Sequence, residues 1–426
     1  MSSSKTEEVL PLMSFTHGDR PLRVLLIAGC FPHPDNERLG VWALSQAEAV
    51  AEQGIEMEVI SPTSYIPRIL GKLGMAPWAA LCPPKAKMGS LWVLFPRWPV
   101  YHAMFGRSLN KRWPGFALAL GWRFVRRALR DAIARRRPDV IFAHHSFEGG
   151  ELARRLKQET GINYVISDWD FDEITDCERF AFRRQHYERV LRSASAVVAT
   201  SGRMKRDLDR LFPGTRVVVA HYGRDPIPAG NFESPRPADR QGKIIIFCAC
   251  GFYRRKGLVV LLEAFSRVQK KYPGCELWIA GDGPDRAEVE AGVRDFGGGH
   301  VRLLGGLSHE QVLQEMVWAD IFALTGWDEP FATVYVEALA AGKPIVCCDD
   351  GGICDVVTHG KEALLVPPRD VAATAQALDS LVGDPAMRGR MSQASSELFY
   401  AKLSRSVYGQ TVAHELAAAA RPSVTL

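Results

Sequence analysis

The strongest constraint on the fold of this sequence is an alternation of short apolar runs with longer segments of helical periodicity. It begins with an apolar run at residues 23–28, continues with a helical segment at 41–52, and returns to an apolar run at 57–60. Strand, helix and strand in this order make a βαβ unit, which requires a crossover connection and a parallel sheet. The first half of the chain therefore predicts an α/β domain.

The same alternation restarts after a break. Residues 226–243 contain four prolines and two glycines and lack apolar periodicity, which is typical of a linker between domains. Beyond this stretch, an apolar run at 244–247 precedes a helical segment at 257–272. The sequence predicts two doubly wound, Rossmann-like α/β domains, at residues 21–225 and 244–403, with a deep cleft between them. The 426 residues of the chain are enough for two such cores.

The remaining segments give weaker signals. We expect residues 1–20 to be a flexible N-terminus and residues 404–426 to form a helix that crosses back toward the first domain. Residues 63–115 are rich in Pro, Trp and Gly, and no element is predicted there.

Cysteine use and hydropathy predict the compartment. None of the nine cysteines belongs to a C-x-x-C pair, so we expect buried, reduced thiols and a reducing compartment. No run of eighteen apolar residues occurs, and the N-terminus lacks a basic stretch followed by an apolar one. We therefore predict a cytoplasmic protein with no transmembrane helix and no signal peptide.

Two glutamates eight residues apart give the sharpest local signal. Glu329 follows a predicted strand and turn, and Glu337 lies about two turns into the next predicted helix. The backbone N–H groups of residues 331–334 lie at the start of that helix, where they are available to an anion such as a diphosphate. Carboxylates on either side of a phosphate suit the hydroxyls of a sugar and a ribose.

An alternative is that Glu329 is an exposed loop acid and Glu337 a solvated helix residue. The apolar neighbours of Glu337, at residues 338–340, argue against this view, since a carboxylate in that setting requires a partner.

The second half carries an ordered series of motifs: Arg254-Arg-Lys-Gly257, Ile279-Ala-Gly-Asp-Gly-Pro284, Gly306-Leu-Ser-His-Glu310, Glu329 to Glu337 and Asp350-Gly-Gly352. This series resembles glycosyltransferase family 4, the group 1 glycosyl transferases, which are retaining enzymes of the GT-B fold. The resemblance covers most of the chain and is densest from Gly251 to Asp370. It implies hexosyl transfer from a nucleoside-diphosphate sugar to a saccharide or lipid-linked acceptor, in polysaccharide or envelope glycan biosynthesis.

The resemblance also implies residue roles. Glu329 approaches the donor sugar, Glu337 binds the ribose, and Lys256 binds the diphosphate. Gly251 stands where the family has an arginine, so Arg254 or Arg255 is expected to supply the missing charge. The catalytic residues implied are Glu329, Lys256, Asp170 and His144. The donor-binding residues implied are Gly40, Gly251, Arg254, Arg255, Lys256, Gly281, Leu307, Glu329, Phe331, Ala332, Thr333, Val334 and Glu337.

The first half matches the family less closely. Gly40 fits the glycine of the family's first loop, although a tight turn that opens a helix explains it equally well. His144 takes the second position of a His-x-His motif, as a polar contact in the cleft or as a structural histidine. Trp169 and Asp170 stand where the family has His-Gly; either the local alignment slips, or the acceptor site uses an acid in place of the histidine.

We expect neither a metal nor a cofactor, because the nucleotide sugar is a substrate. Asp168, Asp170 and Asp172 alternate, but Glu173 and Arg179 stand where a calcium loop requires Gly and Glu.

The segment at residues 107–137 holds ten Lys/Arg and one acid. One face of its predicted helix is apolar, at Leu118, Trp122, Val125, Leu129 and Ile133. This favours a packed helix with a solvated basic face. The alternative is peripheral contact with an anionic membrane, at the inner face of the cell membrane, which would bring the protein to a lipid-linked acceptor.

Other functions fit less well. An NAD-dependent oxidoreductase requires G-x-G-x-x-G after the first strand, which residues 29–33 lack. No nucleic-acid-binding module is present, and the net charge of +5 is mild, so no nucleic acid is expected. A catalytically impaired GT-B scaffold, suggested by Gly251 and Asp170, and a sugar-nucleotide epimerase stay open as alternatives.

Overall fold

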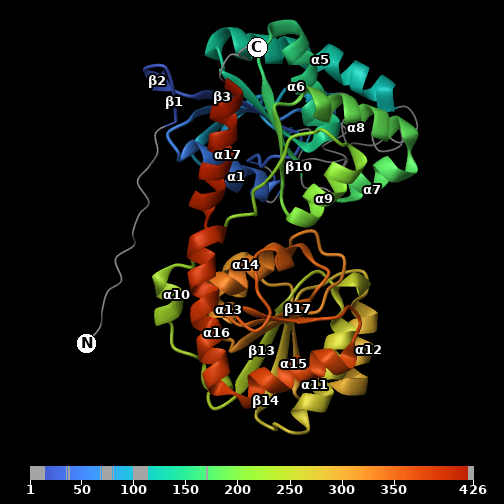
Figure 1. Cartoon of the computed structure of the whole chain (residues 1–426), viewed down its shortest axis with the longest axis vertical. Coiled ribbons are helices and arrows are strands. Elements are labelled where there is room, and N and C mark those ends of the chain that lie inside the picture. The colour runs from blue at the N-terminus through green and yellow to red at the C-terminus, as the bar shows by residue number, and fades with distance from the viewer. Residues whose placement is uncertain are drawn as a thin grey trace. The chain divides into compact units, whose positions relative to one another are not determined.

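The computed structural model describes residues 15–34, 36, 39–67, 69, 79, 81–98, 114–168 and 171–420. They divide into two compact units, which Figure 1 shows as separate α/β bodies. Unit 1 comprises the chain up to residue 200, residues 204–220 and the chain from residue 405. Unit 2 comprises residues 201–203 and 221–404.

Unit 1 is built on an eight-stranded sheet among the described residues. Neighbouring strands are parallel except at the β6–β7 hairpin, and the predicted strand at residues 23–28 is confirmed as β3. The order across the sheet is β12 (Val217–Val219), β11 (Ala196–Ala199), β10 (Tyr164–Asp168), β9 (Val140–His144), β3 (Arg23–Ala28), β4 (Glu56–Ile60), β7 (Leu91–Leu94) and β6 (Lys85–Met88). Two short strands, β5 (Thr63–Ser64) and β8 (Arg97–Trp98), pair separately.

Helices cover this sheet, and the last of them comes from the end of the chain. They are α1 (Val41–Ala51), α5 (Pro114–Arg136), α6 (Gly150–Thr160), α7 (Phe171–Arg179), α8 (Ala181–Ser193), α9 (Gly202–Leu211) and α17 (Arg405–Ala420). α17 runs beside α1 (Figure 1), and a Cβ at Gly409 would lie 2.1 Å from the Ala49 carbonyl oxygen. This close approach makes the C-terminal helix an integral part of unit 1.

The amphipathic prediction for α5 is confirmed for its apolar face. Leu118, Val125 and Leu129 are buried in the core of unit 1, and Trp122 and Ile133 pack against that core. None of the described helices is both long and apolar enough to cross a membrane.

Unit 2 is built on a six-stranded parallel sheet. Its order is β15 (Val301–Gly305), β14 (Cys275–Ala280), β13 (Ile244–Ala249), β16 (Ile321–Leu324), β17 (Ile345–Cys348) and β18 (Ala363–Val366). Its helices are α10 (Ala229–Glu233), α11 (Leu258–Gln269), α12 (Arg286–Phe296), α13 (His309–Trp318), α14 (Thr333–Ala340), α15 (Val371–Gly383) and α16 (Pro385–Leu398). The six strands follow the 3-2-1-4-5-6 order of doubly wound nucleotide-binding sheets.

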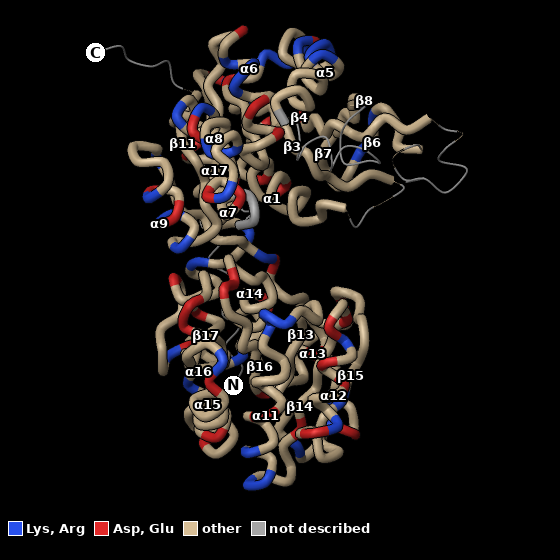
Figure 2. Tube along the Cα trace, turned by 90° about the vertical axis from the view of Figure 1, so that its right-hand side faces the viewer, with Lys and Arg blue, Asp and Glu red and all other residues tan. Residues whose placement is uncertain are grey.

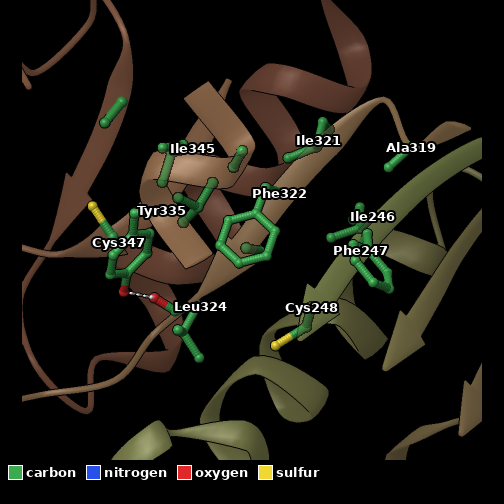
Figure 3. Packing of buried hydrophobic residues seen from close by; sticks show 14 of the residues in the cluster. Ile246, Phe247, Cys248, Ala319, Ile321, Phe322, Leu324, Tyr335, Ile345 and Cys347 are labelled. Carbon is green, nitrogen blue, oxygen red and sulfur yellow. Dashed lines mark hydrogen bonds between the residues drawn. The ribbon is translucent and has the colours of Figure 1, made fainter. Parts of the chain in front are cut away.

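Aromatic packing holds α14 against the sheet of unit 2. The Phe322 ring packs edge-on against Phe247 and Tyr335, and the Tyr335 hydroxyl donates a hydrogen bond of 2.7 Å to the Leu324 carbonyl (Figure 3). This bond joins the end of β16 to the first turns of α14. The loop between them is therefore fixed at both ends.

All nine cysteines are free thiols, as the sequence predicted. Several are strand residues of the unit 2 core, among them Cys248 and Cys347 (Figure 3). Burial raises the pKa of Cys275 to about 12, so this thiol is protonated at neutral pH.

The linker prediction for residues 226–243 is wrong, because this stretch packs on unit 2. It contains α10 and the 3-10 helix η2 (Ala238–Arg240). The Arg236 guanidinium binds Asp320 at 2.7 Å. Arg240 is only 7% exposed and lies between the rings of Trp278 and Trp318. Ion pairs and cation–π contacts leave no apolar periodicity, so the sequence pattern resembles that of a linker.

Two further expectations are corrected. Residues 63–115 include the β6–β7 hairpin, whose strand β7 pairs with β4 in parallel. Within the expected flexible N-terminus, β1 (Thr16–His17) pairs with β2 (Arg20–Pro21), while residues 1–14 lie outside the described chain. The strands concerned have two to four residues, which is too short for a clear periodicity.

Replacing Arg240 with Met should destabilise unit 2 by about 2–3 kcal/mol, because the Glu315 carboxylate loses Arg240 Nη2, which donates to both of its oxygens at 2.6 and 2.8 Å. Met retains most of the aliphatic volume. Urea unfolding followed by tryptophan fluorescence measures the change. The control is Arg267→Gln, which removes an exposed pair on α11 and should cost less than about 0.5 kcal/mol. Equal unfolding midpoints for the two variants would contradict this account.

Candidate active site

The strand order of unit 2 reverses between β13 and β16. The chain passes from β13 to β14 on one side, and later enters β16 on the other side. In open parallel sheets of this order, ligands bind at the carboxyl ends of the strands beside the reversal. The two loops that leave these ends, at residues 250–257 and 325–332, carry most of the predicted donor-site residues.

Opposite charges join the two loops. The Lys256 ammonium lies 2.8 Å from Glu329 Oε2, and the Arg255 guanidinium lies 2.6 Å from Glu329 Oε1. Glu329 is only 3% exposed, so both oxygens of a buried carboxylate are neutralised by cations. The structure thus brings together three of the predicted residues. It also shows that Arg255, of the two arginines considered, contacts Glu329 in the loop at residues 325–332, here called the Glu loop.

A close backbone contact sets this geometry. Gly257 follows the 3-10 helix η3 (Arg254–Lys256) and has φ 69°, a conformation that favours glycine. A Cβ there would lie 2.1 Å from the Thr325 carbonyl oxygen. The Thr325 hydroxyl donates a hydrogen bond of 3.0 Å to the Gly257 carbonyl. Lys256 is therefore held against the Glu loop by its neighbour in the chain.

The Glu329 loop is also fixed from its other side. The Gly352 N–H donates a hydrogen bond of 2.9 Å to the Glu329 carbonyl, and a Cβ at Gly352 would lie 1.7 Å from the Pro330 carbonyl oxygen. Phe331 is buried and stacks on His221, with ring centroids 5.0 Å apart. The Asp350-Gly-Gly352 motif thus supports the loop rather than standing apart from it.

The N-terminus of α14 lies directly after this loop. Ala332 is the N-cap and forms no side-chain cap. The N–H groups of Thr333 and Val334 precede any intrahelical acceptor, and within the described chain no other group accepts from them. This arrangement provides hydrogen-bond donors and the positive end of a helix dipole for an anion.

Glu337 lies further along α14 and is 6% exposed. Its Oε1 lies 3.0 Å from the Arg224 guanidinium and 3.2 Å from His309 Nε2, which confirms that this carboxylate has partners. No partner of Oε2 is found among the described residues. Arg224 and His309 were not predicted: His309 belongs to the Gly306–Glu310 motif, and Arg224 stands at the edge of the expected linker, where no pattern marked it.

The other predicted residues of unit 2 lie around this centre. A Cβ at Gly251 would lie 2.9 Å from the Tyr253 ring, so a larger residue there would displace that ring. Gly281 has φ 142° and approaches the Cys250 carbonyl, a packing role. Leu307 packs against the core. The Arg254 backbone N–H binds Asp285 at 2.6 Å, and the side chain lines a separate cavity.

Unit 1 has its own strand reversal, between β3 and β9. Gly40 is the N-cap of α1 with φ 66°, and a Cβ there would lie 2.6 Å from the Cys30 carbonyl oxygen. His144 ends β9 and is fully buried; burial and the neighbouring His145 lower its pKa to about 3, so its imidazole is neutral at neutral pH. Asp170 and Trp169 lie outside the described residues.

Two family models match most of the chain. Residues 39–223 match the glycosyl transferase 4-like domain, and residues 231–398 match the glycosyl transferases group 1 family. A glycogen synthase of Mycobacterium tuberculosis is 30% identical over 232 residues, which cover 53% of each chain. The lipopolysaccharide core biosynthesis glycosyltransferase LpsD of Rhizobium meliloti is 33% identical over 200 residues, 43% of this chain and 54% of LpsD. The chain thus spans about half the length of these curated relatives.

Solved structures share the fold. Sucrose-phosphate synthase of Thermosynechococcus elongatus superposes with a TM-score of 0.71 at 18% identity, over 92% of this chain and 98% of that one. Anabaena HepE, solved in complex with UDP and glucose, superposes with a TM-score of 0.64 at 17% identity, over 93% and 99%. The two α/β units have the GT-B fold that the motifs implied. The chain belongs to the glycosyltransferases, with a glycosyl transferase 4-like region followed by a group 1 region.

Proposed function

We propose that this protein is a retaining glycosyltransferase that moves a hexose from a nucleoside-diphosphate sugar to a saccharide or lipid-linked acceptor. The observation that carries the proposal is the contact of Lys256 and Arg255 with the buried Glu329, beside the uncapped N-terminus of α14. Cations, a carboxylate and free N–H groups at the strand reversal suit a sugar linked to a diphosphate.

The diphosphate is proposed to bind at the start of α14. The N–H groups of Thr333 and Val334 donate to its oxygens. An ammonium has three donors, so Lys256 can bind a phosphate oxygen while it stays on Glu329. As the glycosidic bond breaks, negative charge grows on the β-phosphate. A fixed cation and fixed N–H donors stabilise that charge most in the transition state, without a cofactor.

The ribose is proposed to bind at Glu337. Arg224 and His309 hold Oε1, which leaves Oε2 to accept hydrogen bonds from ribose hydroxyls. The solved HepE complex holds UDP and glucose, so UDP is the first nucleotide to test. Glu329 is proposed to face hydroxyls of the transferred hexose.

The acceptor is proposed to be a growing polysaccharide or envelope glycan. Relatives in glycogen and lipopolysaccharide core biosynthesis support this class. On the acceptor side we propose Gly40 as a point of close backbone approach, His144 as a neutral hydrogen-bonding group, and Asp170 as the acid that replaces the family's histidine.

An impaired scaffold and an epimerase are the alternatives. The scaffold was suggested by the missing arginine at Gly251, yet the Arg255 guanidinium lies 2.6 Å from Glu329 and supplies a second cation at the loop. Transfer to an added acceptor distinguishes all three, since a scaffold gives no turnover and an epimerase changes the sugar without transferring it.

Replacing Glu329 with Gln should lower the rate of glycosyl transfer about 100-fold or more, because a fixed charge beside the reacting sugar is lost. Gln keeps the shape of a residue that is almost fully buried, and its amide oxygen can still accept a hydrogen bond from one of the two cations, whereas Ala removes both acceptors. Transfer is measured with radiolabelled sugar nucleotides, and UDP binding of the same variant is the control for folding. A variant with near-normal turnover would exclude this role for Glu329.

Calorimetric titration with UDP, GDP and ADP should show tight binding of one nucleotide to the wild-type protein. Replacing Glu337 with Ala should weaken that binding about 10- to 100-fold, since a charged acceptor of ribose hydroxyls is removed. Glu397→Ala, which truncates an exposed glutamate of α16, is the matched control. If Glu337→Ala binds the nucleotide as tightly as this control does, the ribose site lies elsewhere.

Membrane contact through residues 107–137 is proposed from the exposed face of α5, at the inner face of the cell membrane. Residues 107–113 lie outside the described chain. On the described part, Figure 2 shows Lys and Arg gathered along α5. Arg123 and Arg127 are exposed, and Phe124 between them is 54% exposed. Basic and aromatic side chains together suit an anionic bilayer surface.

Replacing Arg123 and Arg127 with Gln should weaken binding to vesicles of 30% phosphatidylglycerol about 30-fold, at roughly 1 kcal/mol for each charge. Vesicle sedimentation measures the effect. The double variant Arg189→Gln with Arg192→Gln removes the same charge from α8 and should bind nearly as the wild type does. If both double variants lose the same affinity for vesicles, net charge alone explains the effect, and docking through α5 is refuted.

A further inference from the structure

Unit 2 has a cavity of about 650 Å³, and Glu337 is not among the residues that line it. It lies over the first turn of α11, between η3, the start of α12 and the side chain of Trp327. α11 and α12 lie side by side in unit 2 (Figure 1). A volume in this range is typical of small-molecule sites.

Three arginines line the cavity: Arg254, Arg255 and Arg369. The Arg255 guanidinium binds Glu329, so Arg254 and Arg369 are the two considered for a ligand. The Arg369 side chain lies over the Trp327 ring, 4.6 Å from its centroid, and is thereby held at the edge. Arg254 is exposed, and its backbone N–H donates to Asp285; no ion pair of its guanidinium is found among the described residues. Both groups suit bidentate binding of a phosphate or carboxylate.

The floor of the cavity adds backbone donors. Leu258, Val259 and Val260 line it, and they form the first turn of α11. Gly257 is the N-cap and has no side chain to bond their N–H groups; the first helical bond is from the Leu261 N–H to the Gly257 carbonyl. These donors and the helix dipole favour an anion in the same space as the guanidinium groups.

The remaining walls suit a sugar ring. Tyr253 is 52% exposed and offers an aromatic surface, as does Trp327. The carboxylates of Asp285 and Glu288 line the same cavity and can accept hydrogen bonds from hydroxyl groups. A purely anionic ligand such as inorganic phosphate would be repelled by these acids, whereas a sugar that carries one anionic group would use both kinds of partner.

We propose that this cavity binds an anionic saccharide, a hexose bearing a phosphate or a carboxylate. The cavity borders the donor site through Arg255 and Gly257, but Lys256, Glu329 and Glu337 do not line it. The anionic group binds to Arg254, Arg369 and the first turn of α11, and the ring hydroxyls bind to Asp285 and Glu288. The proposal does not depend on the catalytic role of Glu329, so either can fail alone.

The test is calorimetric titration of the UDP-saturated full-length protein with glucose 6-phosphate, glucuronate and glucose. UDP occupies the nucleotide part of the donor site, and the cavity variants decide whether an added anion binds in the cavity. Two variants remove the proposed contacts: Arg369→Gln, and Val260→Glu, which places a repelling carboxylate in the cavity. A glutamate in the first turn favours helix formation, so Val260→Glu should fold. Arg267→Gln, at the other end of α11, is the matched control.

Glucose 6-phosphate or glucuronate should bind the wild-type protein and Arg267→Gln with equal affinity. The same ligand should bind Arg369→Gln and Val260→Glu about tenfold more weakly. Glucose should bind the wild-type protein far more weakly than either anion does. Preference between the two anions identifies the phosphate or the carboxylate as the natural group. Equal affinity of all four proteins, equal affinity for glucose, or no binding of either anion would overturn the proposal. If the wild-type protein does not bind UDP, the proposed donor site is refuted. The differences among the variants in affinity for the anionic sugar would still test the cavity.

Discussion

The contact between Gly257 and the Thr325 carbonyl is the constraint on which the candidate site depends. It brings the chain that leaves β13 against the chain that leaves β16, at the point where the strand order reverses. A side chain at residue 257 would separate the two loops, and Lys256 would then no longer reach Glu329. The buried pairing of charges in unit 2 is therefore a consequence of backbone packing, and the ion pairs by themselves do not create it.

Much of this organisation could be predicted from the sequence. Short apolar runs predicted β3 and β13 because parallel strands are buried on both faces and read as continuous apolar stretches. The ordered motifs predicted the Glu329 loop and Lys256, and the apolar neighbours of Glu337 predicted that this carboxylate has a partner. These signals are local. Each depends on a short segment, and the apolar pattern of that segment predicts its backbone conformation and its burial.

The rest depends on contacts between residues far apart in the sequence. Arg224, which lies between β12 and α10, and His309, the first residue of α13, meet at Glu337, and nothing in the neighbourhood of Arg224 predicts its partner. Residues 226–243 lack periodicity because Arg236 and Arg240 hold them by charge and by cation–π contact, so an ordered segment was mistaken for a linker. The short strands β6 and β7 gave too few residues for a pattern, and their place in the sheet is set by pairing with β4.

The position of α17 has a consequence for synthesis of the protein. Unit 1 is closed by residues 405–420, while unit 2 is complete at residue 404. Because a chain is synthesised from its N-terminus, all residues of unit 2 are made before α17. Unit 1 can bury the face of α1 that α17 covers only after that. During that interval the unfinished unit has an apolar helix surface without its cover, so the arrival of α17 decides when this surface is protected from aggregation.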